Sequence, residues 1–248
     1  MTDKELDLLL GLYTIHRWQI IETRRPQNVM EHSFRVWLLA THLYDTLFKV
    51  SHNSFERDGV SRMALLHDAG ELFTGDIPTP VKRAMNELAK DPEFSHKLDE
   101  HVLHRFLPTV AAWSRGQHRT LGGVVVALAD MVEAILYIRE YGHHQQEIFE
   151  IEDKLCEEIC TRLDHAERAY KSVGWKAAEL WVSCRLGYTD LETGDPYLIR
   201  QKTRVPRSPL PASQQEQSPG SCSHPPHSPA DPQASGTSSP DSRLLGPG

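Results

Sequence analysis

ALLHDAGE, residues 64–71, places an adjacent histidine and aspartate, His67 and Asp68, in a helical apolar pattern. Two segments of the same character lie elsewhere in the chain: MEHSFRV, residues 30–36, carries His32, and ALADMVE, residues 127–133, carries Asp130. A carboxylate among apolar neighbours, such as Asp130, is costly to bury unless it is paired or bound to a metal. These segments predict an all-α protein with polar side chains on helices that also have strong apolar faces.

Outward from these segments, apolar residues recur at helical spacing, and alternating strand patterns with turn dipeptides are absent. We therefore expect one all-α domain over residues 1–200. The predicted helices cover 3–15, 29–48, 55–72, a short segment from 79, 93–107, 121–141, 147–173 and 174–185.

Residues at the helix starts support these boundaries. Pro26 prevents the first helix from continuing into the second. Asn28 is a good N-cap, and Glu31 is spaced to complete a capping box. Thr79 and Pro80 resemble an N-cap and a first helical position. The segment TGDIPTP, residues 74–80, is therefore expected to be a loop that ends at a helix start.

The composition changes near residue 201. Between residues 203 and 248 Pro, Ser, Gly and Gln dominate, and large apolar residues are almost absent. Such a segment buries too little surface to offset the entropy of ordering it. We expect a disordered Pro/Ser-rich tail there, in which His224 and His227 are incidental to function.

Charge and cysteine content narrow the class of protein. The chain has a formal charge of -7 with acids and bases mixed, which does not suit a nucleic-acid polymer as a partner. Its 4 cysteines form no CxxC pair, so a reduced compartment is expected. The N-terminus does not resemble a signal peptide, and we expect no stretch that approaches the ~20 apolar residues of a membrane span. We expect a cytoplasmic protein without a membrane partner.

The two histidines and two aspartates form a mixed nitrogen and oxygen set. Such a set suits Zn²⁺, Mn²⁺, Co²⁺, Fe²⁺ or Mg²⁺ and leaves positions for water and a phosphate oxygen. A single histidine on a helix is nevertheless more often a core or surface residue than a ligand. Spacing alone leaves both interpretations open.

Neighbouring residues favour a site. Glu71 follows His67 by four positions, so in one continuous helix both share a face, and its carboxylate could act as a general acid or base. Arg17 could bind a phosphate, and Trp18 could lie against a sugar or base. The alternatives are a helix-end charge for Arg17, a core position for Trp18 and a surface charge for Glu71.

The loop after Glu71 is a further candidate for substrate binding. Asp76 lies beside Gly75 and before Pro78, so stiff backbone fixes its direction. Free N–H groups at the following helix start, with Lys82 nearby, could receive an anion or a sugar hydroxyl. An Asx turn that stabilises the loop is the alternative for Asp76. The candidates here are Asp76, Ile77, Pro78 and Thr79.

Taken in order, His…His-Asp…Asp resembles the HD-domain metal-dependent phosphohydrolases. The strings HRWQIIETRRPQNVMEHS, residues 16–33, and HDAGELFTGDIPTPVK, residues 67–82, resemble the bacterial 5'-deoxynucleotidase branch more narrowly. This resemblance covers residues 10–140. It implies an all-α HD-domain helical bundle, usually a homodimer, which removes the 5'-phosphate from 2'-deoxynucleoside monophosphates.

The resemblance also implies roles for single residues. One divalent ion, Co²⁺, Mn²⁺ or Zn²⁺, would be held by His32, His67, Asp68 and Asp130. Arg17 would orient the phosphate, and Glu71 would be the catalytic carboxylate. Trp18 would press on the sugar and exclude a 2'-hydroxyl, and Asp76 would contact the sugar.

A related class provides an alternative. Certain phage HD enzymes strip the phosphates from dATP, and a Trp-x-Ile segment lies at the base and sugar there. Trp18, Gln19 and Ile20 match that spacing, whereas bacterial nucleotidases usually have Pro after the Trp. Ile20 is therefore a further candidate for substrate binding. An HD phosphodiesterase and a non-catalytic metal-binding helical module are the remaining alternatives.

Overall fold

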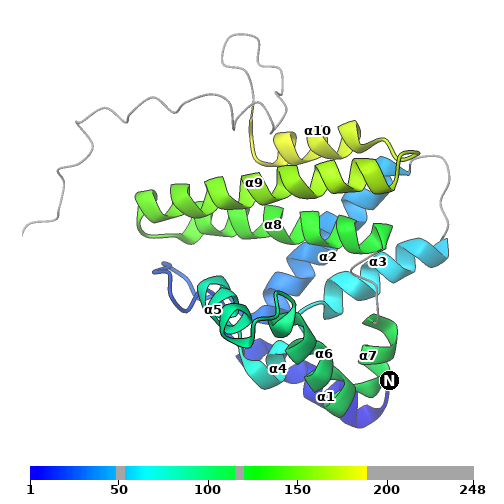
Figure 1. Ribbon diagram of the computed structural model, residues 1–248, viewed down its shortest axis with the longest axis vertical. Helices are drawn as coiled ribbons and strands as arrows, with labels where there is room; N and C mark the ends of the chain where they lie inside the picture. Colours follow the sequence, from blue (N-terminus) through cyan, green and yellow to red (C-terminus); the bar gives the residue numbers. More distant parts are fainter. Residues whose placement is uncertain (49–53, 115–119, 189–248) are drawn as a thin grey trace, which may run out of the picture. The chain divides into compact units, whose positions relative to one another are not determined.

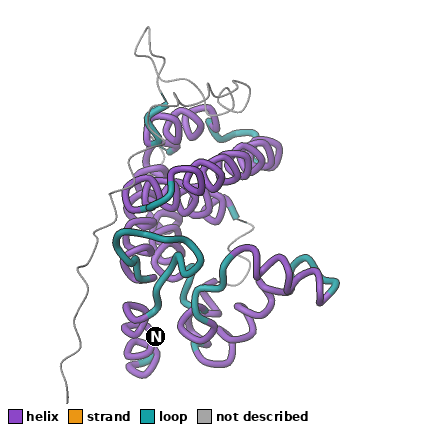
Figure 2. The backbone as a smooth tube through the Cα atoms, turned by 90° about the vertical axis from the view of Figure 1, so that its left-hand side faces the viewer, coloured by secondary structure: helices purple, strands orange, loops and turns teal. Residues whose placement is uncertain are grey.

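The computed structural model describes residues 1–48, 54–114 and 120–188. Within these ranges the chain forms helices joined by loops, and the only strand-like pairings are two isolated bridges (Figures 1 and 2). The predicted all-α class is therefore confirmed. The predicted tail, 203–248, lies outside the described residues. The elements are α1 Asp3–Leu10, η1 Gly11–Thr14, α2 Val29–Leu47, α3 Ser54–Leu66, α4 Glu71–Thr74, α5 Thr79–Ala89, α6 Phe94–Phe106, α7 Pro108–Ser114, α8 Leu121–Tyr141, α9 Gln145–Ala169 and α10 Trp175–Arg185.

The larger core lies among α2, α3, α8, α9 and α10. Helices α8, α9 and α10 lie alongside one another, and α2 packs against both α3 and α8 (Figure 1). Side chains from all five helices are buried there, among them Val36, Leu43, Val60, Leu128, Ile135, Ile159, Leu163 and Trp181. This packing fixes α2, α3 and α8, the helices that carry or precede His32, His67 and Asp130.

A smaller core joins α1, η1, α6 and α7 to the start of α2. Its buried residues include Leu9, Leu12, Val29, Leu103 and Val110. A capping box between Thr2 and Glu5 starts α1, and the Glu5 carboxylate also accepts a hydrogen bond from the backbone N–H of Thr109 at 2.8 Å. This hydrogen bond joins α1 to α7, the first and last helices of the smaller core.

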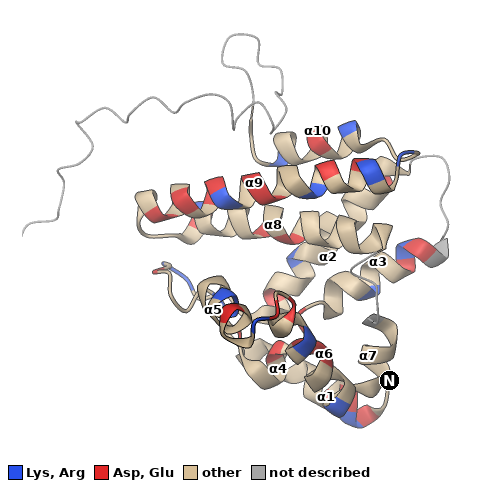
Figure 3. Cartoon of the chain, in the orientation of Figure 1, with Lys and Arg blue, Asp and Glu red and all other residues tan. Residues whose placement is uncertain are grey.

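Helix α8 corrects one expectation from the sequence. This helix has 21 residues, and an 18-residue window within it has a mean hydropathy of 2.0, so it is long and apolar enough to cross a membrane by length and composition. In the structure, however, 67% of that window is buried against other helices, as in the core helix of a globular domain. Charged residues are frequent on α9 and sparse on α8 (Figure 3). Helix α8 is therefore the central core helix.

The predicted helix over 55–72 is interrupted. Helix α3 ends at Leu66, a turn follows, and α4 begins at Glu71. In this turn Ala69 N–H and Glu71 N–H donate to carbonyls three residues earlier, those of Leu66 and Asp68. The His67 ring nitrogen Nδ1 also lies 2.8 Å from the Ala64 carbonyl, which a continuing helix would use for the N–H of Asp68.

Other boundaries follow the predictions closely. Asn28 caps α2 by accepting from Glu31 N–H at 2.8 Å, but the Glu31 carboxylate pairs with Arg25 and closes no capping box. Helix α5 begins at Thr79 itself, with Pro78 in the cap position, one residue earlier than predicted. Helix α7 was not predicted, because its seven residues are too few to show a period.

Candidate active site

The four predicted metal ligands converge. His32 comes from the first turns of α2, His67 and Asp68 from the turn after α3, and Asp130 from the middle of α8. Five distances were obtained between a histidine Nε2 atom and another potential ligand atom, either the second Nε2 or a carboxylate oxygen. They lie between 3.1 and 4.0 Å. Ligands that are each about 2.1 Å from one ion lie no farther than about 4.2 Å apart. One ligand atom each of His32, His67 and Asp130 lies within 4.8 Å of the other two, which suits a shared ion, and Asp68 Oδ2 lies beside this group at 3.2 Å from His67 Nε2 and 3.5 Å from His32 Nε2.

The protonation of the two rings shows why a cation belongs there. Nδ1 of His32 donates to the Glu133 carboxylate at 2.6 Å, and Nδ1 of His67 donates to the Ala64 carbonyl at 2.8 Å. In each neutral ring Nε2 is then a bare acceptor. These two Nε2 atoms face each other at 3.2 Å, with the Asp68 and Asp130 carboxylates beside them. Acceptors this close to one another favour a positive charge among them.

The pKa values of the site residues, taken without a metal ion, also indicate that the site favours a positive charge. Burial lowers the pKa of His67, but the Asp68 and Asp130 carboxylates outweigh it and raise that pKa to about 9. Burial also opposes ionisation of Asp130, yet His32, His67 and Arg17 lower its pKa to about 2, and His67 lowers that of Asp68 further. A proton on His67 thus occupies the place that a divalent ion would take.

A buried network fixes the orientation of His32. The Glu133 side chain is fully buried, and its second oxygen accepts from the Gln27 amide and from Arg35, each at 2.8 Å. Carboxylates that accept from a ligating histidine set its tautomer and raise its basicity. The sequence analysis did not identify Glu133 or Gln27. The sequence does contain one indication of its role, since Glu133 is a charged residue one helical turn after Asp130 on the most apolar helix.

Arg17 lies directly beside the four acceptors. Its Nη1 atom is 3.9 Å from Asp68 Oδ2 and 4.0 Å from Asp130 Oδ1. This atom is buried and forms no hydrogen bond with any described residue. A buried guanidinium atom without an acceptor costs free energy unless a ligand satisfies it. Arg17 is therefore available to bind an anion that lies next to the predicted metal ligands.

Glu71 is a second buried group without a full set of partners. It is 6% exposed, Oε1 lies 3.8 Å from Lys82 Nζ, and Oε2 has no hydrogen-bond partner among the described residues. Burial, with the Asp68 and Asp76 carboxylates, raises the pKa of Glu71 to about 9. The expectation that it shares a helical face with His67 is wrong, because α3 ends at Leu66; the turn and α4 present it instead.

Trp18 is held in an unusual conformation. Its φ of 64° is in the left-handed region, which a bulky residue enters only at a cost. Its ring stacks on Tyr137 at 5.8 Å with 9° between the planes, and its indole N–H donates to Gln27 Oε1 at 2.9 Å. The Arg17 guanidinium lies 5.9 Å from the centre of the same ring. The strained backbone thus places Arg17 and Trp18 side by side.

The remaining predicted substrate-binding residues are less enclosed. Asp76, Ile77 and Pro78 are half-buried in the loop between α4 and α5, and Thr79 is exposed at the start of α5. Asp76 lies close enough to Glu71 and Arg17 to affect their pKa values. Ile20 is 59% exposed.

An all-α fold with His, His-Asp and Asp donors converging from three places defines an HD-domain protein. The chain belongs to the YfbR-like 5'-deoxynucleotidase family, whose model matches residues 6–170.

Individual relatives are similar over part of their length. A 5'-deoxynucleotidase of Klebsiella pneumoniae is 27% identical over 148 residues, 60% of this chain and 66% of the relative. The dATP triphosphohydrolase of Salmonella phage PMBT28 is 34% identical over 146 residues, 57% of this chain and 69% of the relative. This chain thus spans just under two thirds of the first curated relative.

A solved structure has the same fold. It is the HD phosphohydrolase of cyanophage S-2L bound to dA and one catalytic Zn²⁺ ion. The identity is 27%, the TM-score is 0.54, and the match covers 66% of this chain and 85% of that one.

We predict that Glu133→Gln weakens metal binding about 10- to 100-fold, because a neutral amide stabilises the His32 ring less well than a carboxylate does. A competition titration against a chelator measures this affinity. Glu140→Gln, an exposed change on the same helix, is the matched control. Equal metal affinity in both variants would contradict the role of Glu133.

Proposed function

We propose that this protein hydrolyses the 5'-phosphate of 2'-deoxynucleotides, releasing a deoxynucleoside and phosphate. The observation that carries this proposal is the position of Arg17. Its unpartnered Nη1 atom lies within 4.0 Å of two of the four convergent metal ligands. A cation site and a buried guanidinium at one point suit a phosphate better than any neutral group. Membership of the 5'-deoxynucleotidase family supports the same reaction.

In this proposal His32, His67, Asp68 and Asp130 hold one divalent ion, with Co²⁺, Mn²⁺ and Zn²⁺ as the candidates. When bound, such an ion polarises the phosphoryl group and makes water more acidic. The Zn²⁺ ion in the cyanophage structure supports this choice of metals. Mixed imidazole and carboxylate ligands suit these ions better than Mg²⁺, which prefers oxygen ligands alone.

Glu71 is the proposed general acid. Water attacks phosphorus, the bond from phosphorus to the 5'-oxygen breaks, and that oxygen takes a proton as it leaves. Because the pKa of Glu71 is raised to about 9, its carboxyl group keeps a proton at neutral pH and has one to give. Its free Oε2 atom is the position from which the proton would be donated.

Trp18 and the loop from Asp76 to Thr79 are proposed to bind the sugar. The Trp18 ring is held between Tyr137 and Gln27, so it cannot move aside for an additional hydroxyl group. This rigidity supports a preference for deoxyribose over ribose. Asp76 offers a carboxylate to the 3'-hydroxyl, and the free N–H groups at the start of α5 are further donors.

Removal of all phosphates from dATP is the second candidate function. The similarity to the dATP triphosphohydrolase of Salmonella phage PMBT28 favours it. The spacing of Trp18 and Ile20, which matches that phage class, also favours it. We further propose a cytoplasmic enzyme that acts on free nucleotides and not on a nucleic-acid polymer.

A substrate panel tests the function. The purified full-length protein is incubated with dAMP, AMP, dATP and a cyclic dinucleotide, each with Co²⁺, Mn²⁺ or Zn²⁺, and phosphate release is measured. We expect dAMP to be hydrolysed at least about tenfold faster than AMP, since one lost or clashing contact is worth about 1.4 kcal/mol. His32→Ala is the inactive control.

Equal rates for dAMP and AMP would contradict the role of Trp18, and turnover of the cyclic substrate alone would indicate a phosphodiesterase. No turnover in any mixture would favour a non-catalytic metal-binding module.

The proposed role of Glu71 predicts a pH dependence. Because the acid form is the active one, the rate should fall as the pH rises through about 9. We expect Glu71→Gln to lower kcat by at least about 100-fold and to remove this alkaline limb. Glu87→Gln, an exposed change on α5, should leave both unchanged. An unaltered pH profile in Glu71→Gln would show that another group donates the proton.

We also propose a homodimer, as the family resemblance implies. An apolar stripe on α2 supports it: Met30, Phe34 and Leu38 are 37%, 52% and 49% exposed at successive helical turns. Light scattering should give twice the chain mass of 28.2 kDa. Phe34→Glu with Leu38→Glu should give the monomer mass, and a monomeric wild type would refute the dimer.

A further inference from the structure

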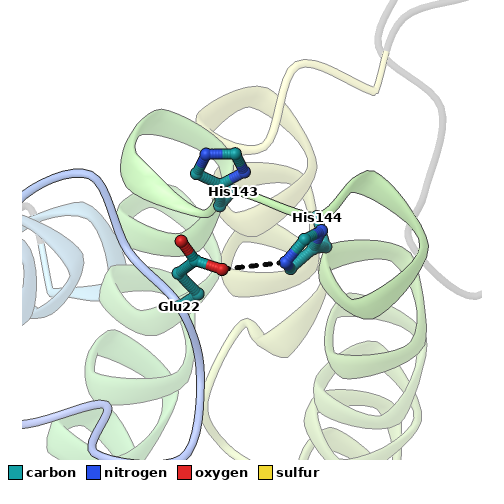
Figure 4. A group of neighbouring side chains, drawn as sticks. All are labelled: Glu22, His143 and His144. Atoms are coloured by element: carbon teal, nitrogen blue, oxygen red, sulfur yellow. Dashed lines mark hydrogen bonds and ion pairs between the residues drawn. The ribbon is translucent and has the colours of Figure 1, made fainter. Parts of the chain in front are cut away.

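Three side chains outside the active site gather at the surface where α8 turns into α9. They are Glu22, His143 and His144, and one ligand atom of each lies within 4.8 Å of those of the other two. His144 Nε2 and Glu22 Oε2 are 3.0 Å apart, and the two imidazole rings are 5.1 Å apart (Figure 4). The reaction proposed above uses none of them.

The backbone brings these residues together, although more than a hundred positions separate Glu22 from the histidines. Thr23 and Gly142 form an isolated antiparallel bridge. On either side of it, Arg24 N–H donates to the Tyr141 carbonyl at 2.7 Å, and His143 N–H donates to the Glu22 carbonyl at 3.0 Å. Flexible side chains alone would not give such a fixed frame.

Gly142 makes the turn tight enough to present both histidines. A Cβ atom at this position would lie 2.5 Å from the Ile138 carbonyl oxygen and 2.7 Å from the Ile148 side chain. The chain therefore passes close to the end of α8, and His143 and His144 follow at once. His144 occupies the N-cap position of α9, but its side chain forms no capping hydrogen bond there and instead contacts Glu22.

The chemistry of the group suits a borderline transition-metal ion. Two imidazole nitrogens and one carboxylate oxygen are ligands of Zn²⁺, Ni²⁺, Cu²⁺ and Co²⁺, and exposure leaves room for water in the remaining positions. The N-terminus of α9 disfavours a cation. Glu147 in the first turn of α9 and Glu22 itself offset that field.

We propose that Glu22, His143 and His144 form a second divalent-metal site, which ties the segment 16–28 to the turn between α8 and α9. That segment begins and ends at the His16–Asn28 bridge and contains Arg17, Trp18 and Gln27. An ion bound by Glu22 on one side and by the two histidines on the other restrains the segment at its outer end. The proposal has two parts, which are metal binding at the surface and a restraint on the segment 16–28. Neither part depends on the reaction that the active site performs.

Zn²⁺ binding to the full-length protein tests the site. Equilibrium dialysis followed by metal analysis should find two equivalents in the wild type and one in His143→Ala with His144→Ala. The variant His32→Ala with Asp130→Ala should keep one equivalent, which separates the surface site from the active site. His224→Ala with His227→Ala removes two imidazoles outside this cluster and should still bind two. Two equivalents in the His143 and His144 variant, or none in the His32 and Asp130 variant, would overturn the proposal.

Hydrogen exchange of residues 19–25 tests the restraint. Zn²⁺ should slow exchange in this segment of the wild type and of the His32 and Asp130 variant, but not in the His143 and His144 variant. Circular dichroism confirms that each variant is folded. Zn²⁺ bound at the surface site without slower exchange would refute the tie between the segment and the turn.

Discussion

Four hydrogen-bond acceptors that point at one another are the constraint on which this structure depends. The Nδ1 atoms of His32 and His67 both donate to other groups, so both Nε2 atoms face the site as lone pairs beside the Asp68 and Asp130 carboxylates. Such an arrangement is repulsive without a cation, and only the surrounding packing keeps it in place. The larger core supplies that packing, because α2, α3 and α8 each pack against the other two.

The same constraint explains the character of the residues around the site. Helix α8 is almost wholly apolar, yet it carries Asp130 toward the cation and Glu133 toward the back of His32. Each acid is satisfied by a partner from a different part of the chain, which is what burial of a charge requires. Arg17 and Glu71 are exceptions, because each has a buried atom that no described residue satisfies. These two unsatisfied atoms distinguish a binding site from a purely structural cluster of charges.

The sequence was sufficient for the all-α class and for most of the helices, since periodicity shows the apolar faces, and it predicted His32, His67 and Asp130, which the structure brings together. It was insufficient where the structure depends on contacts between distant segments. Gln27 and Glu133 are 106 positions apart, and nothing local to either shows that they share a hydrogen bond. The end of α3 at Leu66 was missed because the ring of His67 competes for a backbone carbonyl, which no propensity describes. Glu71 was thus predicted as a site residue from a shared helical face with His67, which the structure does not have, although it does lie buried close to Asp68 and Arg17.

The amide of Gln27 has a consequence beyond holding two neighbours in place. It accepts from the Trp18 indole through its oxygen and donates to Glu133 through its nitrogen, and Glu133 in turn accepts from His32. The ring expected to touch a sugar and the ring expected to bind a metal are therefore joined by a chain of hydrogen bonds, in which donation from both ends meets at the Glu133 carboxylate. A ligand that displaced the Trp18 indole would disturb the hydrogen bonds of Gln27 and, through Glu133, the group that orients the His32 ring. Where that disturbance changes the affinity for a metal ion, thermodynamic reciprocity requires that the ion changes the affinity for the ligand by the same factor. Nucleotide and metal would thus act as cooperative effectors of each other within a single domain.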